Sequence, residues 1–252
     1  MKKNYKITVS YDGTRYSGWQ NQGNTGETIQ AKLENVLSRF ANEHIDVIGA
    51  GRTDAGVHAI GMVANFHLPG ETAPTEPEEV LSYLNKYLPD DICVTDIKEA
   101  SERFHSRYNA AGKTYKYTCF IAGENNSKPI FDRNYVHILD SMPDVPAMKK
   151  AAADLVGEHD FKSFCANPRF NKSSVRTIDD IKITVNGSRL IFTYHADGFL
   201  QNMVRILTGT LLEVGYKQRA CDSMPDIIAA RDRKAAGYMA PAKGLCLVKV
   251  EY

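Results

Sequence analysis

The residues best suited to chemistry lie in one short segment that combines small residues with an arginine and an aspartate. It reads Gly49-Ala50-Gly51-Arg52-Thr53-Asp54-Ala55-Gly56. The small residues before Arg52 allow a bulky ligand to approach the backbone. In an extended chain, residues two apart share a face, so we expect the Arg52 guanidinium to pair with the Asp54 carboxylate and hold it ionised. Asp54 is therefore a candidate nucleophile, and the alternative interpretation is an aspartate that begins a turn.

Other common catalytic and cofactor-binding patterns are missing from the sequence. The glycines at 49, 51 and 56 match neither the dinucleotide-binding pattern nor the P-loop. The histidines form no compact ligand pair, and the five cysteines include no C-x-x-C pair. No second carboxylate motif completes an aspartic-protease dyad or supplies the acid of a retaining glycosidase. We therefore expect no metal and no cofactor.

Basic residues elsewhere in the chain suggest contacts with an anionic partner. Arg205 lies at the edge of an apolar helical stripe, where its guanidinium can reach a carboxylate or a phosphate or form a salt bridge at the helix surface. Two clusters of basic and aromatic residues suit phosphate contact and base stacking, although a solvated surface loop has the same composition. They are Arg103, Arg107, Lys113 and Lys116, and Arg169, Lys172 and Arg176 beside Phe161, Phe164 and Phe170.

Hydrophobic periodicity predicts the elements that hold these residues. Alternation predicts strands at 5–11, 45–51, 62–68, 92–97, 113–120, 134–139, 178–185, 190–195 and 245–252, with 15–20 returning as a hairpin partner of the first. Helical spacing predicts helices at 29–40, with Thr28 as N-cap, and at 77–88, 146–156, 200–214 and 225–231. Asn186-Gly187 predicts a tight hairpin turn. Because helices follow hairpins, we expect an α+β fold of mostly antiparallel sheets with helices on one face.

The length and charge of the chain set limits on its organisation and partners. The 252 residues suffice for two α+β lobes, and we place the division between residues 1–107, which carry the Arg-Thr-Asp segment, and residues 108–252, which complete a cleft between the lobes. A formal net charge of +1 means that nucleic-acid binding would need a local basic patch. No apolar run approaches the ~18 residues of a membrane span, and no apolar core follows the lysines at positions 2 and 3, so we expect a cytoplasmic protein.

Four blocks of residues, spread over nearly the whole chain, form a recognisable set. They are Tyr11-Asp12-Gly13 with Gly18-Trp19-Gln20, Gly51-Arg52-Thr53-Asp54-Ala55-Gly56-Val57-His58, Phe104-His105-Ser106-Arg107 with Lys113-Thr114-Tyr115-Lys116-Tyr117, and Asn202-Met203-Val204-Arg205 with Gly244-Leu245. Together they resemble the tRNA pseudouridine synthase A family. One departure is Asn21, where many relatives have arginine, and it affects the expected RNA contacts rather than the chemistry.

The resemblance implies a function and a set of site residues. It implies that a homodimer isomerises uridine to pseudouridine at positions 38, 39 and 40 of the tRNA anticodon stem-loop. Asp54 would be the catalytic nucleophile or base, with Arg52, Tyr115 and Arg205 around it. The substrate-binding residues would be Tyr115, Leu245, Arg107 and Lys113. The isomerisation adds no atoms and changes no redox state, which agrees with the expected absence of a cofactor.

Two functions of other classes compete with this interpretation. A non-catalytic RNA-binding module would show the same basic and aromatic residues. A small-molecule hydrolase would use Asp54 as its nucleophile, but the sequence offers no partner acid. Tyr115 and His58 also have ordinary structural explanations, as a packed strand residue and as a hydrogen-bonded histidine.

Overall fold

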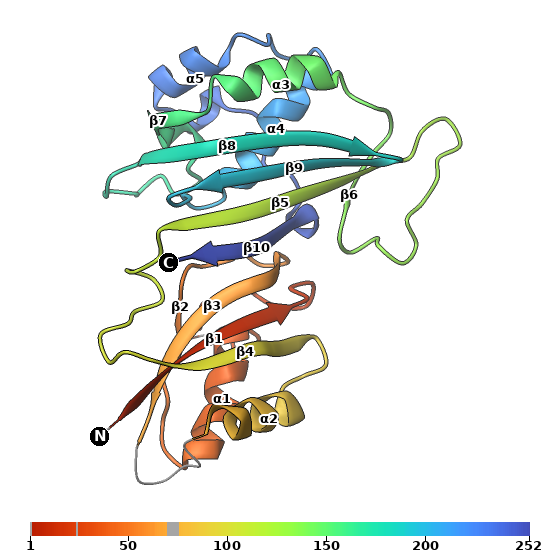
Figure 1. Ribbon diagram of the computed structural model, residues 1–252. Coiled ribbons are helices and arrows are strands. Elements are labelled where there is room, and N and C mark those ends of the chain that lie inside the picture. Colours follow the sequence, from red (N-terminus) through yellow and green to blue (C-terminus); the bar gives the residue numbers. More distant parts are fainter. Residues whose placement is uncertain (1, 24, 70–75) are drawn as a thin grey trace. The chain divides into compact units, whose positions relative to one another are not determined.

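The computed structural model describes residues 2–23, 25–69 and 76–252, which form two compact units (Figure 1). The first unit comprises the chain up to Ala111 together with Leu247–Tyr252, and the second comprises Gly112–Cys246. The first unit is therefore built from both ends of the chain. Both units mix helices with mostly antiparallel strands, which confirms the predicted α+β class.

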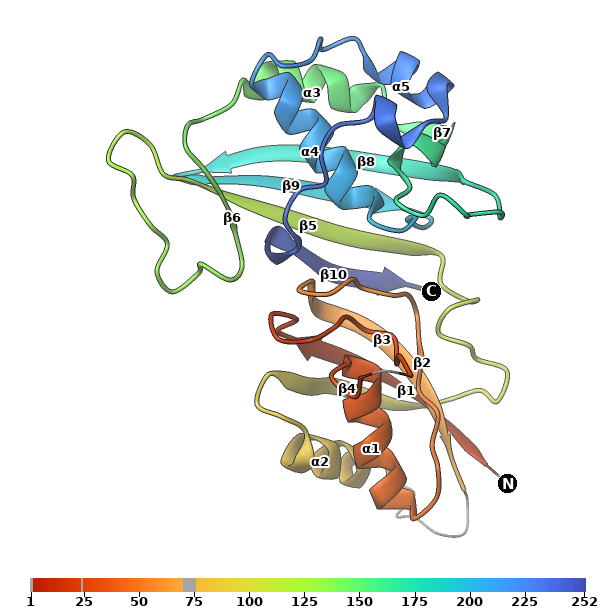
Figure 2. The same ribbon diagram turned by 180° about the vertical axis from the view of Figure 1, so that it is seen from behind.

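The first unit contains a sheet with two helices on one face (Figure 2). Its central strand order is β4-β1-β3, the short β2 pairs with β3, and β10 lies on the other side of β3. The elements are β1 (Lys3–Tyr11), α1 (Ile29–Ala41), β2 (Ile48–Gly49), β3 (His58–Leu68), α2 (Pro77–Tyr87), β4 (Ile92–Ala100) and β10 (Leu245–Glu251), the first two residues of which belong to the second unit.

Helix α1 forms where the sequence predicts it, with the N-cap and the buried apolar face that the sequence indicates. The Thr28 hydroxyl accepts a hydrogen bond from the Ala31 N–H at 3.3 Å and caps the first turn. Leu33 and Leu37 lie one turn apart on the buried face of the helix, and both are fully buried. The helix also holds the chain before β2, because Gln30 donates to the Val47 carbonyl and Glu34 accepts the Val47 N–H.

The second unit contains an antiparallel sheet with the strand order β5-β9-β8-β7, and β6 runs parallel to β5. Leu190, Phe192 and Tyr194 alternate along β9 on a fully buried face, and the Tyr194 hydroxyl bonds to Thr208 of α4 at 2.9 Å. The elements are β5 (Gly112–Ile121), β6 (His137–Leu139), α3 (Val145–Ala153), β7 (Gly157–Asp160), β8 (Val175–Asn186), β9 (Arg189–Ala196), α4 (Met203–Gly215) and α5 (Met224–Ala230).

Several local predictions differ from the structure, among them the strand at 134–139, which shortens to His137–Leu139. Residues 15–20 form turns and bends instead of a strand, because their backbone groups bond to several segments. The Ser17 N–H donates to the Glu27 carbonyl, and the Trp19 N–H donates to the Thr53 carbonyl. The predicted strand at 45–51 shortens to Ile48–Gly49. The hairpin loop is 187–188, one residue later than predicted, because Asn186 still pairs with Arg189.

None of the helices in the described part of the chain is both long enough and apolar enough to cross a membrane.

Candidate active-site residues

The 52–57 loop, which carries Arg52, Thr53 and Asp54, connects β2 to β3. The Ala50 N–H still bonds to the Val63 carbonyl at 2.8 Å, so the loop leaves the sheet only after this residue. The Val57 N–H then bonds to the Asp54 carbonyl at 3.1 Å, and Gly56 has a φ of +76°. Asp54 therefore begins a tight turn, as the alternative interpretation of the sequence predicted. Its side chain is half-buried, while Thr53 is buried.

The 11–19 segment holds this loop from one side. The Tyr11 and Thr53 hydroxyls lie 2.8 Å apart in the core, and the Trp19 N–H donates to the Thr53 carbonyl at 3.0 Å. The Gly56 N–H bonds to the Tyr16 carbonyl at 3.4 Å. The backbone is thus fixed on both sides of Asp54. Tyr11 and Trp19 belong to the first block of the family resemblance, but the sequence did not show that they position the 52–57 loop.

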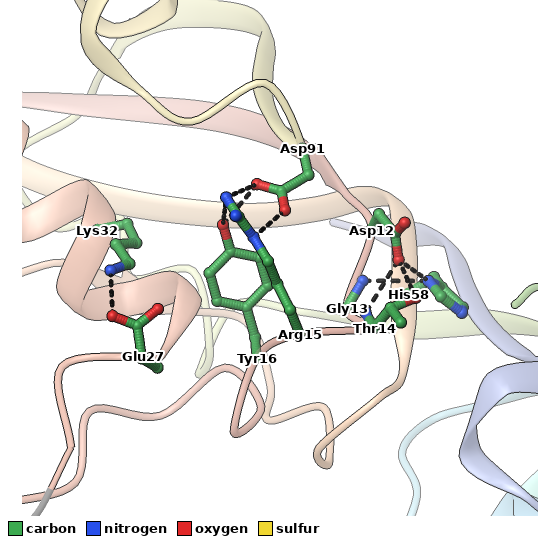
Figure 3. A network of polar contacts seen from close by, with 9 residues as sticks. All are labelled: Asp12, Gly13, Thr14, Arg15, Tyr16, Glu27, Lys32, His58 and Asp91. Carbon is green, nitrogen blue, oxygen red and sulfur yellow. Dashed lines mark hydrogen bonds and ion pairs between the residues drawn. The ribbon is translucent and has the colours of Figure 1, made fainter.

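The 11–19 segment is itself anchored at two points away from the loop (Figure 3). The Gly13 N–H donates to His58 Nδ1 at 3.1 Å, and Asp12 Oδ1 lies 3.1 Å from the same nitrogen. The Tyr16 hydroxyl donates to Asp91 at 2.5 Å, and Arg15 pairs with the same carboxylate.

These anchors identify two of the side chains as structural. Burial, followed by the hydrogen bond to Asp91, raises the pKa of Tyr16 to about 12, so its phenol stays a protonated donor at neutral pH. His58 is buried and contacts the Gly13 N–H and the Asp12 carboxylate, which favours its structural interpretation over a catalytic one.

Gly18→Ala is expected to destabilise the protein, because the loop leaves no room for a methyl group. An added Cβ would lie 2.6 Å from the Thr53 carbonyl oxygen, and the φ of +95° disfavours any side chain. Such backbone strain costs roughly 1–3 kcal/mol. Urea unfolding followed by circular dichroism measures the loss. Gly26→Ala is the matched control, because its Cβ would meet nothing within 4 Å; equal stability of the two variants would contradict the close packing.

Arg52 does not form the ion pair expected from the sequence. Its Nε donates to the Gln20 side-chain oxygen at 2.9 Å, and the guanidinium is otherwise exposed. Gln20 is oriented for this contact because its own amide donates to Gln30 at 2.7 Å. The expectation of a direct Arg52–Asp54 pair is therefore wrong: Arg52 instead bonds to Gln20, which lies 32 residues earlier in the chain.

Asn21, the departure from the family pattern, has a structural partner. Its amide donates to the buried carboxylate of Glu34 at 3.1 Å. The same carboxylate also accepts hydrogen bonds from the Gln30 amide and the Val47 N–H. Asn21 thus helps to satisfy a buried acid of α1.

The second unit positions the remaining candidate residues on β5, α4 and β10. Tyr115 is nearly buried on β5, with its ring edge-on to Phe199 at 5.2 Å. Arg205 donates from Nε to the Ala240 carbonyl and from Nη1 to the Asn202 side chain, both at 2.7 Å. Leu245 is buried at the start of β10, and Lys113 is half-exposed on β5. The guanidinium of Arg205 is therefore held at two atoms.

The proposed RNA-binding clusters differ in their exposure. Arg103 and Arg107 are exposed, as are Arg169 and Lys172. Phe161 and Phe164, by contrast, are fully buried, so these two rings are not available for the base stacking suggested for the second cluster. Their apolar rings complete the core beneath β8. The local sequence alone does not reveal this burial. Within the described ranges of the chain, no three His, Cys, Asp or Glu side chains gather closely enough to hold a metal ion.

Comparison with known proteins extends over almost the whole sequence. A family model described as tRNA pseudouridine synthase matches residues 7–109 and 151–252. A Bacillus anthracis protein named tRNA pseudouridine synthase A 2 is 40% identical over 99% of this chain and 99% of its own length. A Clostridium perfringens protein of the same name is 42% identical over 99% of this chain and 100% of its own. A chain from a solved Cbf5-Nop10-Gar1 complex aligns with 96% of this chain and 48% of its own, at 13% identity and a TM-score of 0.37.

Asp54 and Arg205 lie within the residues that the family model matches, and Tyr115 lies in the interval between the two matched ranges. The chain belongs to the tRNA pseudouridine synthase family, whose members isomerise uridine to pseudouridine in tRNA.

Proposed function

We propose that this enzyme acts on uridines 38, 39 and 40 of the tRNA anticodon stem-loop. The resemblance of the four sequence blocks to the tRNA pseudouridine synthase A family supports this target, and the full-length relatives carry the name of that family. From the same resemblance we propose a homodimer, and from the sequence patterns described above a cytoplasmic enzyme that needs neither metal nor cofactor.

Asp54 is the proposed nucleophile or base. Its carboxylate would attack the base at C6 or the sugar at C1′, or assist removal of the sugar proton. Each route needs an ionised carboxylate in a fixed position. The observation that carries the proposal is the anchoring of the 52–57 loop, where Tyr11, Trp19 and Gly56 fix the backbone on both sides of Asp54. Such preorganisation is what an enzyme needs to orient a reacting group.

The other catalytic candidates would supply charge and an aromatic ring. Arg205 and Arg52 would stabilise negative charge on the carboxylate or the RNA backbone. Tyr115 would stack on the target uracil and place its phenol near the proton to be removed. Leu245 would complete the base-binding surface, and Arg107 and Lys113 would contact phosphates. The fixed guanidinium of Arg205 and the exposure of Arg107 support these roles.

Release of tritium from tRNA labelled at C5 of its uridines tests the proposed target. The isomerisation joins C5 to the sugar, so the hydrogen at C5 must leave for solvent. We expect release from a transcript whose only labelled uridines lie at positions 38 to 40, and product mapping should find pseudouridine there. A transcript labelled only outside the anticodon stem-loop is the control.

The outcomes separate this function from its rivals. A non-catalytic RNA-binding module would bind the transcript and release no tritium, and a small-molecule hydrolase would leave the label in the RNA. Release from the control transcript alone would reject the anticodon target while retaining the enzyme class. Release with an intact Asp54→Asn variant would reject the role of the carboxylate.

A further inference from the structure

A turn in the first unit presents an aromatic ring that none of the roles above uses. The 105–109 turn follows β4, and its Tyr108 side chain is 77% exposed. The His105 imidazole lies against the Tyr108 ring, with centroids 4.2 Å apart and planes inclined by 32°. One face of Tyr108 is thus supported by a second ring while most of its surface stays in solvent.

Hydrogen bonds make the turn rigid. The His105 N–H donates to the Asn109 side chain at 2.7 Å, and the Asn109 N–H returns to the His105 carbonyl at 3.0 Å. His105 Nδ1 accepts the N–H groups of Arg107 and Tyr108 at 3.2 and 3.3 Å. The imidazole that supports the Tyr108 ring is therefore itself fixed to the backbone of the turn.

The core of the first unit holds this turn through Ser106, which is fully buried. Its N–H donates to Asn65 at 2.9 Å and its hydroxyl to the Ile48 carbonyl at 2.5 Å. The Tyr252 hydroxyl donates to the Ser106 carbonyl at 2.8 Å. Strands β2, β3 and the end of the chain therefore set the position from which Tyr108 projects.

The charges around the ring suit an anionic ligand. Arg103 shortly before the turn and Arg107 within it are both exposed, and Glu102 is the single carboxylate among residues 101–109. Proteins that bind single-stranded RNA combine such cations with aromatic rings on which bases stack. Tyr87 differs in how much of its ring is open: it is 44% exposed, Tyr83 lies 4.5 Å from its ring, and Arg39 and Lys86 lie over the ring at 5.7 and 5.3 Å.

We propose that Tyr108 stacks on an unpaired nucleobase of tRNA while Arg107 and Arg103 contact the adjoining phosphates. The proposal rests on the proposed tRNA-modifying function and adds a base-stacking residue to it. Stacking needs no side-chain ordering at the moment of binding, because the turn is already fixed by His105, Asn109 and Ser106.

Equilibrium binding of the full-length chain to an unmodified tRNA transcript tests the ring. Tyr108→Ala and Tyr108→Leu should each raise Kd by about 5- to 150-fold, which corresponds to the loss of one stacked base. Tyr108→Phe and Tyr108→Trp should stay within about twofold of wild type, since both keep an aromatic face. Tyr87→Ala is the matched control and should bind like wild type.

Salt dependence separates stacking from phosphate contact. Tyr108→Ala should leave the slope of log Kd against log salt unchanged, whereas Arg107→Gln should reduce it by about 0.7 to 0.9, the value for one phosphate. The Tyr108→Trp variant adds a direct signal, because a stacked base quenches indole fluorescence. The natural Trp19 is 1% exposed and provides the constant background.

Several results would overturn the proposal. They are wild-type affinity of Tyr108→Ala, equal affinity of the leucine and phenylalanine variants, and an unquenched Tyr108→Trp. A change of sedimentation coefficient in Tyr108→Ala would instead assign the ring to an interface with a second copy of the chain. Thermal unfolding should not differ among the variants, because the ring is exposed.

Failure of the proposed function gives a different result: the wild type would bind as described but release no tritium from the anticodon stem-loop.

Discussion

Asp54→Asn is expected to reduce pseudouridine formation by about 10²- to 10⁴-fold or more, the range for loss of a group that transfers a proton or attacks the substrate. The amide keeps the shape of the carboxylate but removes its charge. The turn should survive, because the Val57 N–H bonds to the backbone carbonyl of residue 54, and asparagine begins turns as well as aspartate does. Single-turnover tritium release measures the rate, and binding to unmodified tRNA should change little.

Two further variants test whether the loss of rate depends on the position of the carboxylate. Asp54→Glu keeps the charge but moves it by one methylene, so it should also be severely impaired. Asp96→Asn removes an exposed carboxylate of β4 that pairs with Lys98, and its rate should match that of wild type. A rate for Asp54→Asn within tenfold of wild type would rule out a nucleophilic or basic role.

Arg205→Lys is expected to lower the single-turnover rate by about 10²- to 10³-fold, the usual cost of losing one preorganised charged donor. The guanidinium donates from two different atoms to Ala240 and Asn202, and one ammonium group does not reproduce this fork. Arg205→Ala should be at least as impaired. The rate is measured at saturating tRNA, so that weakened binding does not contribute.

Arg219 offers a matched control for this prediction. It lies in the same unit and also donates from two atoms, to the Glu213 carboxylate and to the Ala235 carbonyl, both at 3.0 Å. Arg219→Lys should therefore disturb packing in a comparable way without affecting the rate at saturating tRNA. Equal loss of rate in the two lysine variants would show that Arg205 acts only by holding its unit together.

Local sequence was sufficient for the helices, most strands and the candidate catalytic loop. Thr28 followed by apolar residues at helical spacing predicts α1, and alternation predicts β9, because capping and periodicity involve residues that are close along the chain. The 49–58 segment can likewise be recognised from the sequence, since its small residues, arginine and aspartate are contiguous. The turn at Asp54 likewise involves only residues that are close along the chain.

Tertiary structure alone decided the contacts between distant segments. Arg52 bonds to Gln20 rather than Asp54, the 15–20 segment holds Thr53 instead of pairing as a strand, and Phe161 is part of the core. The return of residues 247–252 to the first unit is a further case, because an alternating strand can add to any free sheet edge. Periodicity specifies which face of an element is buried, but the partner it is buried against depends on hydrogen bonds and packing between residues far apart in sequence.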